Sequence, residues 1–302
     1  MSVRHFLAET DLTKAEFKAL LVRAEELRTL WEAGEIYSPF HHKTLAMIFE
    51  KSSTRTRVSF EAGMTQLGGH AIHLSPRDSQ FGRGEPLDDT ARVLSRMVDI
   101  VMIRTASHDS VERFSEASNV PVINGLTDLL HPCQMLADMQ TYLHHRGDIE
   151  GKTVAWIGDG NNVCNSYLKI AKLLGFKLRV AHPQGYGPDA DILTESGDSV
   201  VIAETPEAAC DKADLVVTDV WSSMGQEEEN DVRQIAFKQY CVTPELMALA
   251  APDALFMHCL PAHRDEEVMA AVIDGPQSVV WDEAGNRLHA QKALMEFLLT
   301  QN

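Results

Sequence analysis

The sequence predicts an α/β protein of two domains, each a parallel sheet flanked by helices, with a C-terminal helix that packs back on the first domain. Short apolar runs of strand length alternate with longer segments of helical spacing, as βαβ units require. The 302 residues are enough for two separate cores. A polar, glycine-bounded break at 147–152 sets the boundary. We therefore expect domains at 1–147, joined by a helix at about 288–302, and at 148–287.

The composition limits the classes of function. Hydrophobic residues make up 44% and charged residues 24% of the chain, which are globular values. The net charge of -17 disfavours nucleic acid or an anionic membrane as a partner. Five widely spaced cysteines without a Cys-x-x-Cys pair are typical of reduced thiols, and neither a signal peptide nor a run of transmembrane length stands out. We expect a cytoplasmic protein.

The first half of the chain alternates strands and helices. Strands are predicted where short apolar runs end in polar residues or glycine, and helices where apolar residues recur every three or four positions. A capping box from Thr13 to Glu16 starts the first helix, and Pro132 suits the first position of another. The expected order is helix 13–34, strand 44–49, a helix opening at 53–56, strand 70–74, helix 87–98, strand 99–103, helix 110–117, strand 120–124 and a helix opening at 131–134.

The junction between strand 44–49 and the next helix is the strongest candidate binding site. The free amides of a first helical turn and the positive end of the helix dipole favour an anion, and the hydroxyls of Ser53, Thr54 and Thr56 add donors. Arg55 can grip a phosphate with two hydrogen bonds. For a generic Ser-Thr-Arg string, the alternative is an ordinary capped helix with solvated arginines. We expect Arg57 to form a structural ion pair.

Two further residues occupy positions that suit ligand binding. Arg104 ends a buried strand, and open α/β sheets bind ligands beyond the carboxyl ends of their strands, although a salt-bridged rim arginine is an equal alternative. His131 begins a helix, whose dipole favours the neutral imidazole, a suitable donor to an oxyanion, although such a histidine is often only a cap. Residues 75–86 form either a mobile surface loop or a functional lid.

The second half continues the alternation and contains a misleading glycine pattern. Strands are expected at 153–157, 177–182, 199–203, 215–218, 255–258 and 279–281. Gly158-x-Gly160 after the first of these invites a dinucleotide-binding interpretation. However, Val163 stands at the third glycine position and no acidic residue closes the next strand, so we do not expect a nicotinamide cofactor. Taken alone, Asp219 fits a helix cap and Cys259 fits inert packing.

Several strings of the chain together resemble the aspartate and ornithine carbamoyltransferases. They are Ser-Thr-Arg-Thr-Arg after Phe-Glu-Lys, His-Pro-Cys-Gln from 131, Ser-Met-Gly from 223 and His-Cys-Leu-Pro from 258, in the family's order over nearly the whole chain. The last two strings match the ornithine branch. The resemblance implies transfer of a carbamoyl group from carbamoyl phosphate to the δ-amine of L-ornithine, giving L-citrulline and phosphate, in arginine biosynthesis. Putrescine, acylated ornithine and aspartate stay open as alternative acceptors.

The same resemblance assigns roles to residues. The first domain would bind carbamoyl phosphate and the second ornithine, with no metal, flavin or nicotinamide. The implied catalytic residues are Arg104, His131, Asp219 and Cys259. The implied ornithine ligands are Asn162, Asp219, Ser223 and Met224. The implied carbamoyl phosphate ligands are Ser53, Thr54, Arg55, Thr56, Gln80, Arg104, His131, Gln134, Cys259, Leu260 and Arg287. Gln80 matches a residue that reaches a neighbouring subunit's pocket, which implies a homo-oligomer, a trimer or a multiple of trimers.

Overall fold

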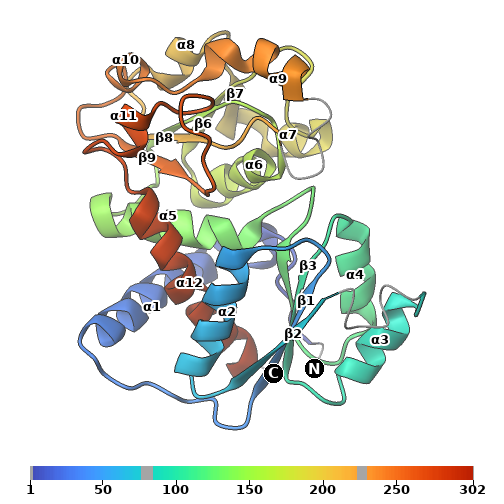
Figure 1. The fold of residues 1–302 in the computed structure, drawn as a ribbon. Helices are drawn as coiled ribbons and strands as arrows, with labels where there is room; N and C mark the ends of the chain where they lie inside the picture. The colour runs from blue at the N-terminus through green and yellow to red at the C-terminus, as the bar shows by residue number, and fades with distance from the viewer. Residues whose placement is uncertain (1–2, 76–83, 223–229, 302) are drawn as a thin grey trace. The chain divides into compact units, whose positions relative to one another are not determined.

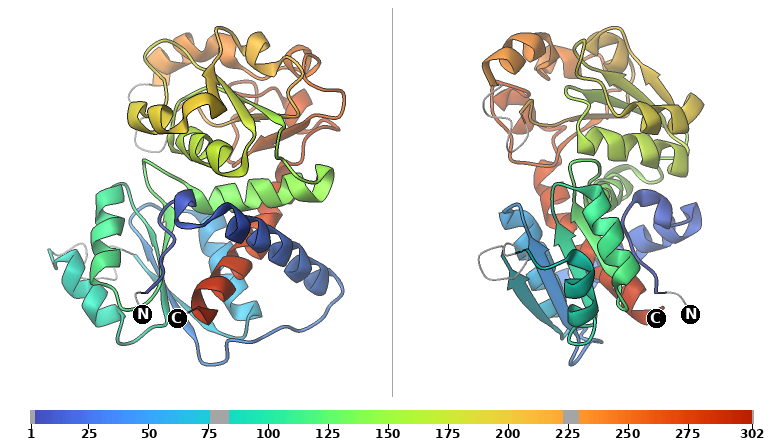
Figure 2. Two further views of the ribbon diagram at one scale, coloured as in Figure 1. Left: turned by 180° about the vertical axis from the view of Figure 1, so that it is seen from behind. Right: turned by 90° about the vertical axis from the view of Figure 1, so that its right-hand side faces the viewer.

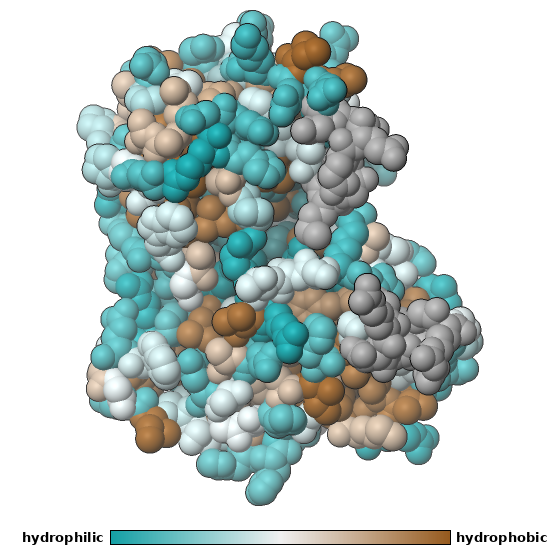
Figure 3. All heavy atoms as spheres, in the orientation of Figure 1, coloured by the Kyte–Doolittle hydropathy of each residue, from teal (hydrophilic) through white to brown (hydrophobic). Residues whose placement is uncertain are grey.

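The computed structural model describes residues 3–75, 84–222 and 230–301 (Figure 1). The chain separates into two compact units, Met1–Gln140 with Gly285–Asn302, and Thr141–Ala284. Each unit contains one parallel sheet flanked by helices, so the predicted fold class is confirmed. Hydrophilic residues cover much of the face drawn in Figure 3, as expected for a net charge of -17. Among the described helices, none is both long and apolar enough to cross a membrane.

The first unit is built on a sheet with the strand order β2-β1-β3-β4, in which every pairing is parallel. Its elements are η1 (Glu9–Asp11), α1 (Lys14–Glu32), β1 (Thr44–Phe49), α2 (Thr54–Gln66), β2 (His70–Leu74), α3 (Leu87–Leu94), β3 (Ile100–Arg104), α4 (His108–Ala117), β4 (Val122–Leu126), most of α5 (Pro132–Arg146) and most of α12 (Val280–Thr300).

The C-terminal helix α12 packs on α1 and α2, as the sequence predicts. Arg23 of α1 pairs with Glu296 at 2.6 Å. Gln66, the last residue of α2, accepts a hydrogen bond from Lys292 at 3.0 Å. At Gly63 a Cβ would lie 3.2 Å from the Lys292 side chain, so the glycine allows the two helices to approach closely. These contacts make residues 285–302 part of the first unit's core.

The opposite face of this sheet is covered by α3 and α4 (Figures 1 and 2). Apolar side chains of β1, β3 and β4 pack there against Ala91 of α3 and against Val111 and Phe114 of α4. Phe114 is fully buried, which contributes about 1.5–3 kcal/mol to stability. Helix α3 is shorter than expected, because Ser95 caps it and residues 95–98 form a turn that returns the chain to β3.

The second unit has the strand order β7-β6-β5-β8-β9, again with parallel pairings only. Its elements are β5 (Thr153–Ile157), α6 (Asn162–Leu174), β6 (Lys177–Ala181), α7 (Ala190–Ser196), η3 (Gly197–Ser199), β7 (Val200–Ile202), α8 (Pro206–Cys210), β8 (Leu215–Thr218), α9 (Asn230–Phe237), η5 (Lys238–Tyr240), α10 (Pro244–Met247), β9 (Leu255–His258) and α11 (Ala270–Ile273).

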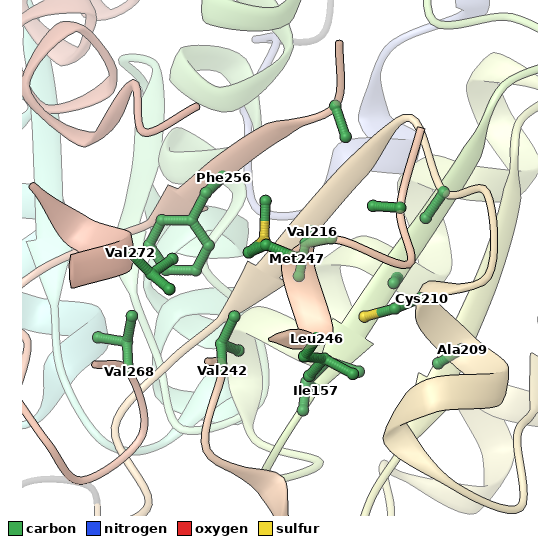
Figure 4. Packing of buried hydrophobic residues seen from close by; sticks show 14 of the residues in the cluster. Ile157, Ala209, Cys210, Val216, Val242, Leu246, Met247, Phe256, Val268 and Val272 are labelled. Atoms are coloured by element: carbon green, nitrogen blue, oxygen red, sulfur yellow. The ribbon is translucent and has the colours of Figure 1, made fainter. Parts of the chain in front are cut away.

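One face of the second sheet forms a continuous apolar core with the short helices that cover it (Figure 4). Ile157, Val216 and Phe256 come from three different strands and face this core. Cys210 of α8 and Leu246 of α10 pack there too, so the thiol of Cys210 serves as packing. Burial raises the pKa of Cys210 to about 12, and the group stays an uncharged thiol at neutral pH.

The prediction of a strand at 279–281 is wrong, because helix α12 already begins at Val280. Next to the sheet, this part of the chain forms an isolated bridge between Phe256 and Ser278, together with a hydrogen bond from the Val279 amide to the Phe256 carbonyl at 3.0 Å. Two carboxylates, Asp282 and Glu283, lie in the first turn of α12, where the helix dipole stabilises negative charge. The segment therefore forms a helix, because the apolar run at 279–281 is too short to specify a strand.

In each sheet, two adjacent strands mark the point where the strand order reverses. The first sheet reverses between β1 and β3, and the second between β5 and β8. Doubly wound sheets bind ligands beyond the carboxyl ends of the strands at such a point. Glu50 and Thr105 follow β1 and β3, and Gly158 and Asp219 follow β5 and β8. Both units therefore place polar segments where the fold favours a site.

Candidate functional site

In the first unit the chain turns from β1 into α2 through Ser53, the N-cap of the helix. The Ser53 side chain accepts a hydrogen bond from the Thr56 amide at 3.3 Å, and the two hydroxyl oxygens lie 3.1 Å apart. Thr56 is fully buried, whereas Thr54 is exposed. The helix end thus places first-turn amides and one exposed hydroxyl side by side, an arrangement that suits an anion.

Two buried arginines from distant parts of the chain meet at Thr56. Arg104, the last residue of β3, donates from Nη1 to Thr56 Oγ1 at 3.4 Å, and Arg287 of α12 donates from Nη2 at 2.9 Å. The Ser53 hydroxyl donates to the same Thr56 oxygen at 3.1 Å, so donors surround this oxygen on several sides. The proton of the Thr56 hydroxyl is therefore available to a ligand oxygen.

Arg287 links this threonine to the start of α5. Its Nη1 donates to Gln134 Oε1 at 2.7 Å and lies 3.4 Å from His131 Nε2. Gln134 in turn donates to Asp138 at 2.8 Å, which fixes the orientation of the amide. We call Thr56, Arg104, His131, Gln134 and Arg287 the cationic cluster. Every member is at least nine-tenths buried.

The electrostatics of the cationic cluster keep His131 uncharged. Burial lowers the pKa of His131 well below its usual value, and the positive charges of Arg287, Arg104 and Arg55 lower it further. At neutral pH the ring is therefore a neutral imidazole that can donate from one nitrogen. Two buried guanidinium groups, those of Arg104 and Arg287, lie beside this neutral ring and raise the local electrostatic potential. A positive potential of this kind attracts an anion.

A cavity of about 610 Å³ lies beside the N-terminus of α2. Ser53 and Thr54 line it, together with Glu50, Arg57 and the aromatic ring of Phe49. Arg57 forms the expected ion pair, with Glu61 at 3.1 Å. The cavity gives a small polar ligand access to the exposed hydroxyl of the helix cap.

In the second unit Asp219 lies just beyond β8 and organises the loops at the strand ends. Its Oδ2 accepts from Asn161 Nδ2 at 2.7 Å, and its Oδ1 lies 3.2 Å from Cys259 Sγ and accepts from the Val220 amide at 2.8 Å. The carboxylate is almost fully buried. The thiol of Cys259 donates to a carboxylate here, so it is not the inert packing residue that a lone cysteine suggests.

Asn161 is a residue that our sequence reasoning missed. It is the N-cap of α6, and its side-chain oxygen accepts from the amides of Val163 and Cys164 while its nitrogen points to Asp219. Asn162, the expected ligand, is the first residue of the same helix. The sequence signal was present, because asparagine is a preferred N-cap and two asparagines stand side by side at this helix start.

The His-Cys-Leu-Pro segment is held by a fully buried pair that the sequence did not reveal. His258 Nδ1 accepts from the Leu260 amide at 2.9 Å, so its Nε2 carries the proton and donates to Glu267 Oε1 at 3.1 Å. His258 and Glu267 are both inaccessible to solvent. Leu260 has a φ of 58°, a left-handed conformation that costs about 1–2 kcal/mol. The bond to His258 helps to hold this turn, which carries Cys259.

The glycine turn after β5 is occupied by the chain itself. A Cβ on Gly160 would lie 2.1 Å from the Gly187 carbonyl carbon, and the Gly160 amide donates to the Tyr186 carbonyl at 2.9 Å. Asp159, between the two glycines, pairs with Arg233 at 3.0 Å, and burial raises its pKa to about 6 although Arg233 opposes the shift. Gly160 thus allows the segment at Tyr186 and Gly187 to approach the turn closely. In a dinucleotide-binding protein, the pyrophosphate would lie against this glycine instead.

The structure brings most of the expected residues into two groups. Thr56, Arg104, His131, Gln134 and Arg287 lie together in the first unit, with Ser53 bonded to Thr56. Arg55 is close enough to lower the pKa of His131. Asp219 and Cys259 meet in the second unit, with Leu260 next in the chain. Three expected ligands lie outside the described residues, namely Gln80, Ser223 and Met224.

Comparison with known families gives a match to each half of the chain. Residues 4–144 match the carbamoyl-P binding domain of aspartate/ornithine carbamoyltransferase, and residues 150–298 match the Asp/Orn binding domain. The ornithine carbamoyltransferase of Acinetobacter baumannii is 61% identical over 302 residues, which is 100% of this chain and 99% of the relative. That of Halorhodospira halophila is 63% identical over 297 residues, covering 98% and 99% of the two chains.

Solved structures agree with the sequence matches. The ornithine carbamoyltransferase of Burkholderia thailandensis superposes with a TM-score of 0.92 at 56% identity, covering 98% of this chain and 99% of that one. The enzyme of Pyrococcus furiosus gives 0.92 at 48% identity, covering 97% and 96%. Both matches extend over both sheets, including the segments from which the two groups of site residues come. This chain belongs to the aspartate/ornithine carbamoyltransferase family.

Proposed function

We propose that the protein is an ornithine carbamoyltransferase, which transfers the carbamoyl group of carbamoyl phosphate to the δ-amine of L-ornithine and releases L-citrulline and phosphate. The observation that carries the proposal is the cationic cluster at the N-terminus of α2, where Arg104 and Arg287 meet on Thr56. Relatives of about the same length that are named ornithine carbamoyltransferase support the choice of reaction.

In the first unit, we assign carbamoyl phosphate to the end of α2 and the cationic cluster. Ser53, Thr54 and Arg55 would hold the phosphate with the free amides of the helix. Thr56, Arg104 and His131 would donate to the carbonyl oxygen, on which negative charge grows as the amine attacks. Each such donor is worth about 3 kcal/mol of transition-state stabilisation. Gln134 would bind the carbamoyl amide, and Arg287 would help to hold the phosphate.

In the second unit, we assign ornithine to the loops after β5 and β8. Asn162, Ser223 and Met224 would bind the α-amino acid end, together with Asp219. Cys259 would lie beside the δ-amine, because its thiol already donates to Asp219 at 3.2 Å. Leu260 would present its backbone to the carbamoyl amide. These assignments follow the match to the ornithine branch of the family.

The reaction requires the δ-amine in its neutral form. Its nitrogen lone pair forms a bond to the carbamoyl carbon while the bond from that carbon to the phosphate oxygen breaks. The attacking nitrogen gives up one proton, and the departing phosphate is a suitable acceptor. The value of kcat/KM for ornithine should therefore rise with pH as the δ-ammonium group loses its proton. A flat profile from about pH 6 to 9 would contradict a mechanism that requires deprotonation of the amine.

A citrulline assay tests the proposal. The purified protein is supplied with carbamoyl phosphate and, separately, with ornithine, putrescine or aspartate, and a reaction without acceptor corrects for spontaneous decomposition. We expect citrulline from ornithine with a kcat/KM at least about tenfold above that of either other acceptor, a difference of about 1.4 kcal/mol in transition-state binding. A preference for putrescine or aspartate would overturn the acceptor assignment and leave the cationic cluster unchallenged.

We further propose that the enzyme acts in arginine biosynthesis in the cytoplasm, as a trimer or a multiple of trimers. All five cysteines are free thiols, in keeping with a reducing compartment. Gln80 would complete the pocket of a neighbouring subunit. Mixed oligomers test this, because Gln80→Ala and Arg55→Ala subunits, each inactive alone, should regain part of the activity when they are unfolded and refolded together. No regain would contradict a shared pocket.

A further inference from the structure

We propose that His263, Glu266 and Glu267 form a binding site for a divalent transition-metal cation, with Zn²⁺ as the best match. The three residues lie in the segment between β9 and α11, after the residues assigned to ornithine. One ring nitrogen and one oxygen from each carboxylate lie within 4.8 Å of one another. The proposal adds a second ligand to the protein and does not depend on the carbamoyltransferase reaction.

The separations between the ligand atoms suit one small cation. His263 Nδ1 lies 3.9 Å from Glu266 Oε2 and 3.9 Å from Glu267 Oε2. Neighbouring ligands of a tetrahedral Zn²⁺ with bonds of about 2.0–2.1 Å lie about 3.4 Å apart. A contraction of about half an ångström at these two pairs, with the two carboxylate oxygens drawn together from within 4.8 Å, would therefore complete the site. His263 and Glu266 are partly exposed, so their side chains can make this adjustment.

Glu267 is the observation that points to a ligand rather than to a chance surface cluster. Its side chain is fully buried, and its Oε1 accepts from His258 Nε2 at 3.1 Å and from the His263 amide at 2.6 Å. Its Oε2 is equally buried but makes no hydrogen bond. A buried carboxylate oxygen without a donor is costly, by about 1–3 kcal/mol or more for a charged group. That oxygen faces the imidazole of His263, and a cation between them would satisfy it.

The donor set narrows the identity of the cation. One imidazole with two carboxylates suits borderline cations such as Zn²⁺, whereas Mg²⁺ and Ca²⁺ prefer sites with oxygen ligands only. Three protein ligands leave a fourth position for water, so the site would be open to solvent. Asp219, His258 and Cys259 form a second group with suitable ligand atoms, and the test must separate the two.

A cation bound to Glu267 would act on the turn that carries Cys259. The carboxylate bonds to the ring of His258, and the same ring accepts the Leu260 amide. Neutralising Glu267 from its Oε2 side weakens it as an acceptor on its Oε1 side, and this change passes through one imidazole to Leu260. The geometry therefore links occupation of the metal site to the shape of the turn.

Calorimetric titration of the chelator-treated protein with Zn²⁺ tests the site. The Cys259→Ala background removes the thiol of the competing group, and we expect it to retain one equivalent of Zn²⁺. In that background, His263→Ala and Glu266→Gln should each raise the Kd by about tenfold or more, since each removes a direct ligand. Both residues are partly exposed, so the variants should fold, which circular dichroism verifies.

A matched control is His41→Ala in the same background, which removes an exposed histidine outside the cluster and should leave the Kd unchanged. Two results would overturn the proposal. One is a Cys259→Ala protein that binds no Zn²⁺, because binding would then belong to the thiol group. The other is a Kd that His263→Ala leaves unaltered. Neither result bears on citrulline formation, so the proposed reaction is tested separately.

Discussion

The two sheets carry their polar groups at equivalent topological positions but with opposite character. Where the order of the first sheet reverses, Arg104 joins Arg287 around a neutral histidine. Where the order of the second reverses, Asp219 accepts from an amide and a thiol. The same fold position thus offers positive charge in one unit and negative charge in the other. A doubly wound sheet fixes where a ligand binds, and the residues that end its strands fix the ligand's charge.

The difference matters for a reaction between an anion and a cation. Carbamoyl phosphate is anionic, whereas ornithine arrives with ammonium groups, one of which must lose its proton. The first unit can attract its substrate with buried fixed charges that do not titrate near neutral pH. The second unit needs side chains that form hydrogen bonds with the amine, and Cys259 and Asp219 are already hydrogen-bonded to each other there. We therefore expect changes in the first unit to act through lost charge and changes in the second to act through lost hydrogen bonds.

The largest expected effect is that of Arg287→Ala. Arg287 contacts Thr56, Gln134 and His131, so its loss removes positive charge and loosens the whole cluster. We expect kcat/KM for carbamoyl phosphate to fall by about 10²- to 10³-fold, the usual loss when a preorganised donor to developing charge is removed. Steady-state citrulline formation measures it. Arg113→Ala, which removes an exposed arginine of the same unit, is the control and should change little.

If Arg287→Ala lost less than about tenfold, roughly 1.4 kcal/mol, buried charge would not be what distinguishes the first unit. The variant Arg287→Lys separates the effect of the charge from that of the guanidinium geometry. It keeps the charge but loses the planar fork that reaches Thr56 and Gln134 together, so it should fall between the wild type and the alanine variant. Recovery of full activity by lysine would show that charge alone is sufficient.

Asp219→Asn should have a smaller effect that is confined to the second unit. The change keeps the shape but removes the charge that accepts from Asn161 and Cys259, at a cost of about 2 kcal/mol or roughly thirtyfold in kcat/KM for ornithine. The Kd of carbamoyl phosphate, measured by calorimetry, should stay the same. Asp211→Asn, an exposed aspartate of the same unit, is the control. An equal loss in both measurements would contradict two separate half-sites.

The sequence predicts the architecture well because local patterns determine it. Parallel strands buried on both faces are short apolar runs, and these runs identify β1, β3, β5 and β8 with nearly correct bounds. The position of Arg104 also follows from a local rule, since it ends a buried strand. Even the unexpected helical start at Val280 has a local cause in the acidic first turn of α12.

What the sequence alone could not give are the contacts between distant segments. Thr56 and Arg287 are 231 positions apart, and no periodicity relates them; only the family resemblance grouped them. The buried pair of His258 and Glu267 was missed because glutamate is almost never fully buried and nothing local marks this one as an exception. Asn161 was missed for a different reason: two asparagines stand side by side, the family motif matches Asn162, and nothing local shows that the N-cap is the one that reaches Asp219.

The neutral state of His131 predicts how stability depends on pH. Its pKa in the folded protein lies well below the value of about 6.5 for a free imidazole, so below that pH the unfolded chain binds protons that the folded chain does not. Stability should therefore be unaffected by this group above pH 6.5 and should fall as the pH drops, by at most about 1.4 kcal/mol per unit. Urea unfolding at pH 5 to 8 measures the slope.

His131→Asn removes this titrating group and should flatten the slope, whereas His41→Asn, an exposed histidine, should leave it unchanged. Two other histidines of the first unit have lowered pKa values, His5 by burial and His289 by burial beside Lys292, so part of the slope will remain. Identical slopes in the wild type and His131→Asn would mean that His131 is not held neutral. The proposed contrast between the two units, fixed positive charge in the first and hydrogen-bonding groups in the second, would then be contradicted.

The smallest expected effect is that of Asn161→Ala. It removes the N-cap of α6 and the amide donor to Asp219 in one change. Loss of the cap should lower the free energy of unfolding by about 1 kcal/mol. Asn161→Ser separates the two roles, because serine caps a helix but is too short to reproduce the amide's contact with Asp219. If the serine variant regained stability while the KM for ornithine stayed raised, Asn161 would be a positioning residue for Asp219, and parallel recovery of both would leave it a helix cap only.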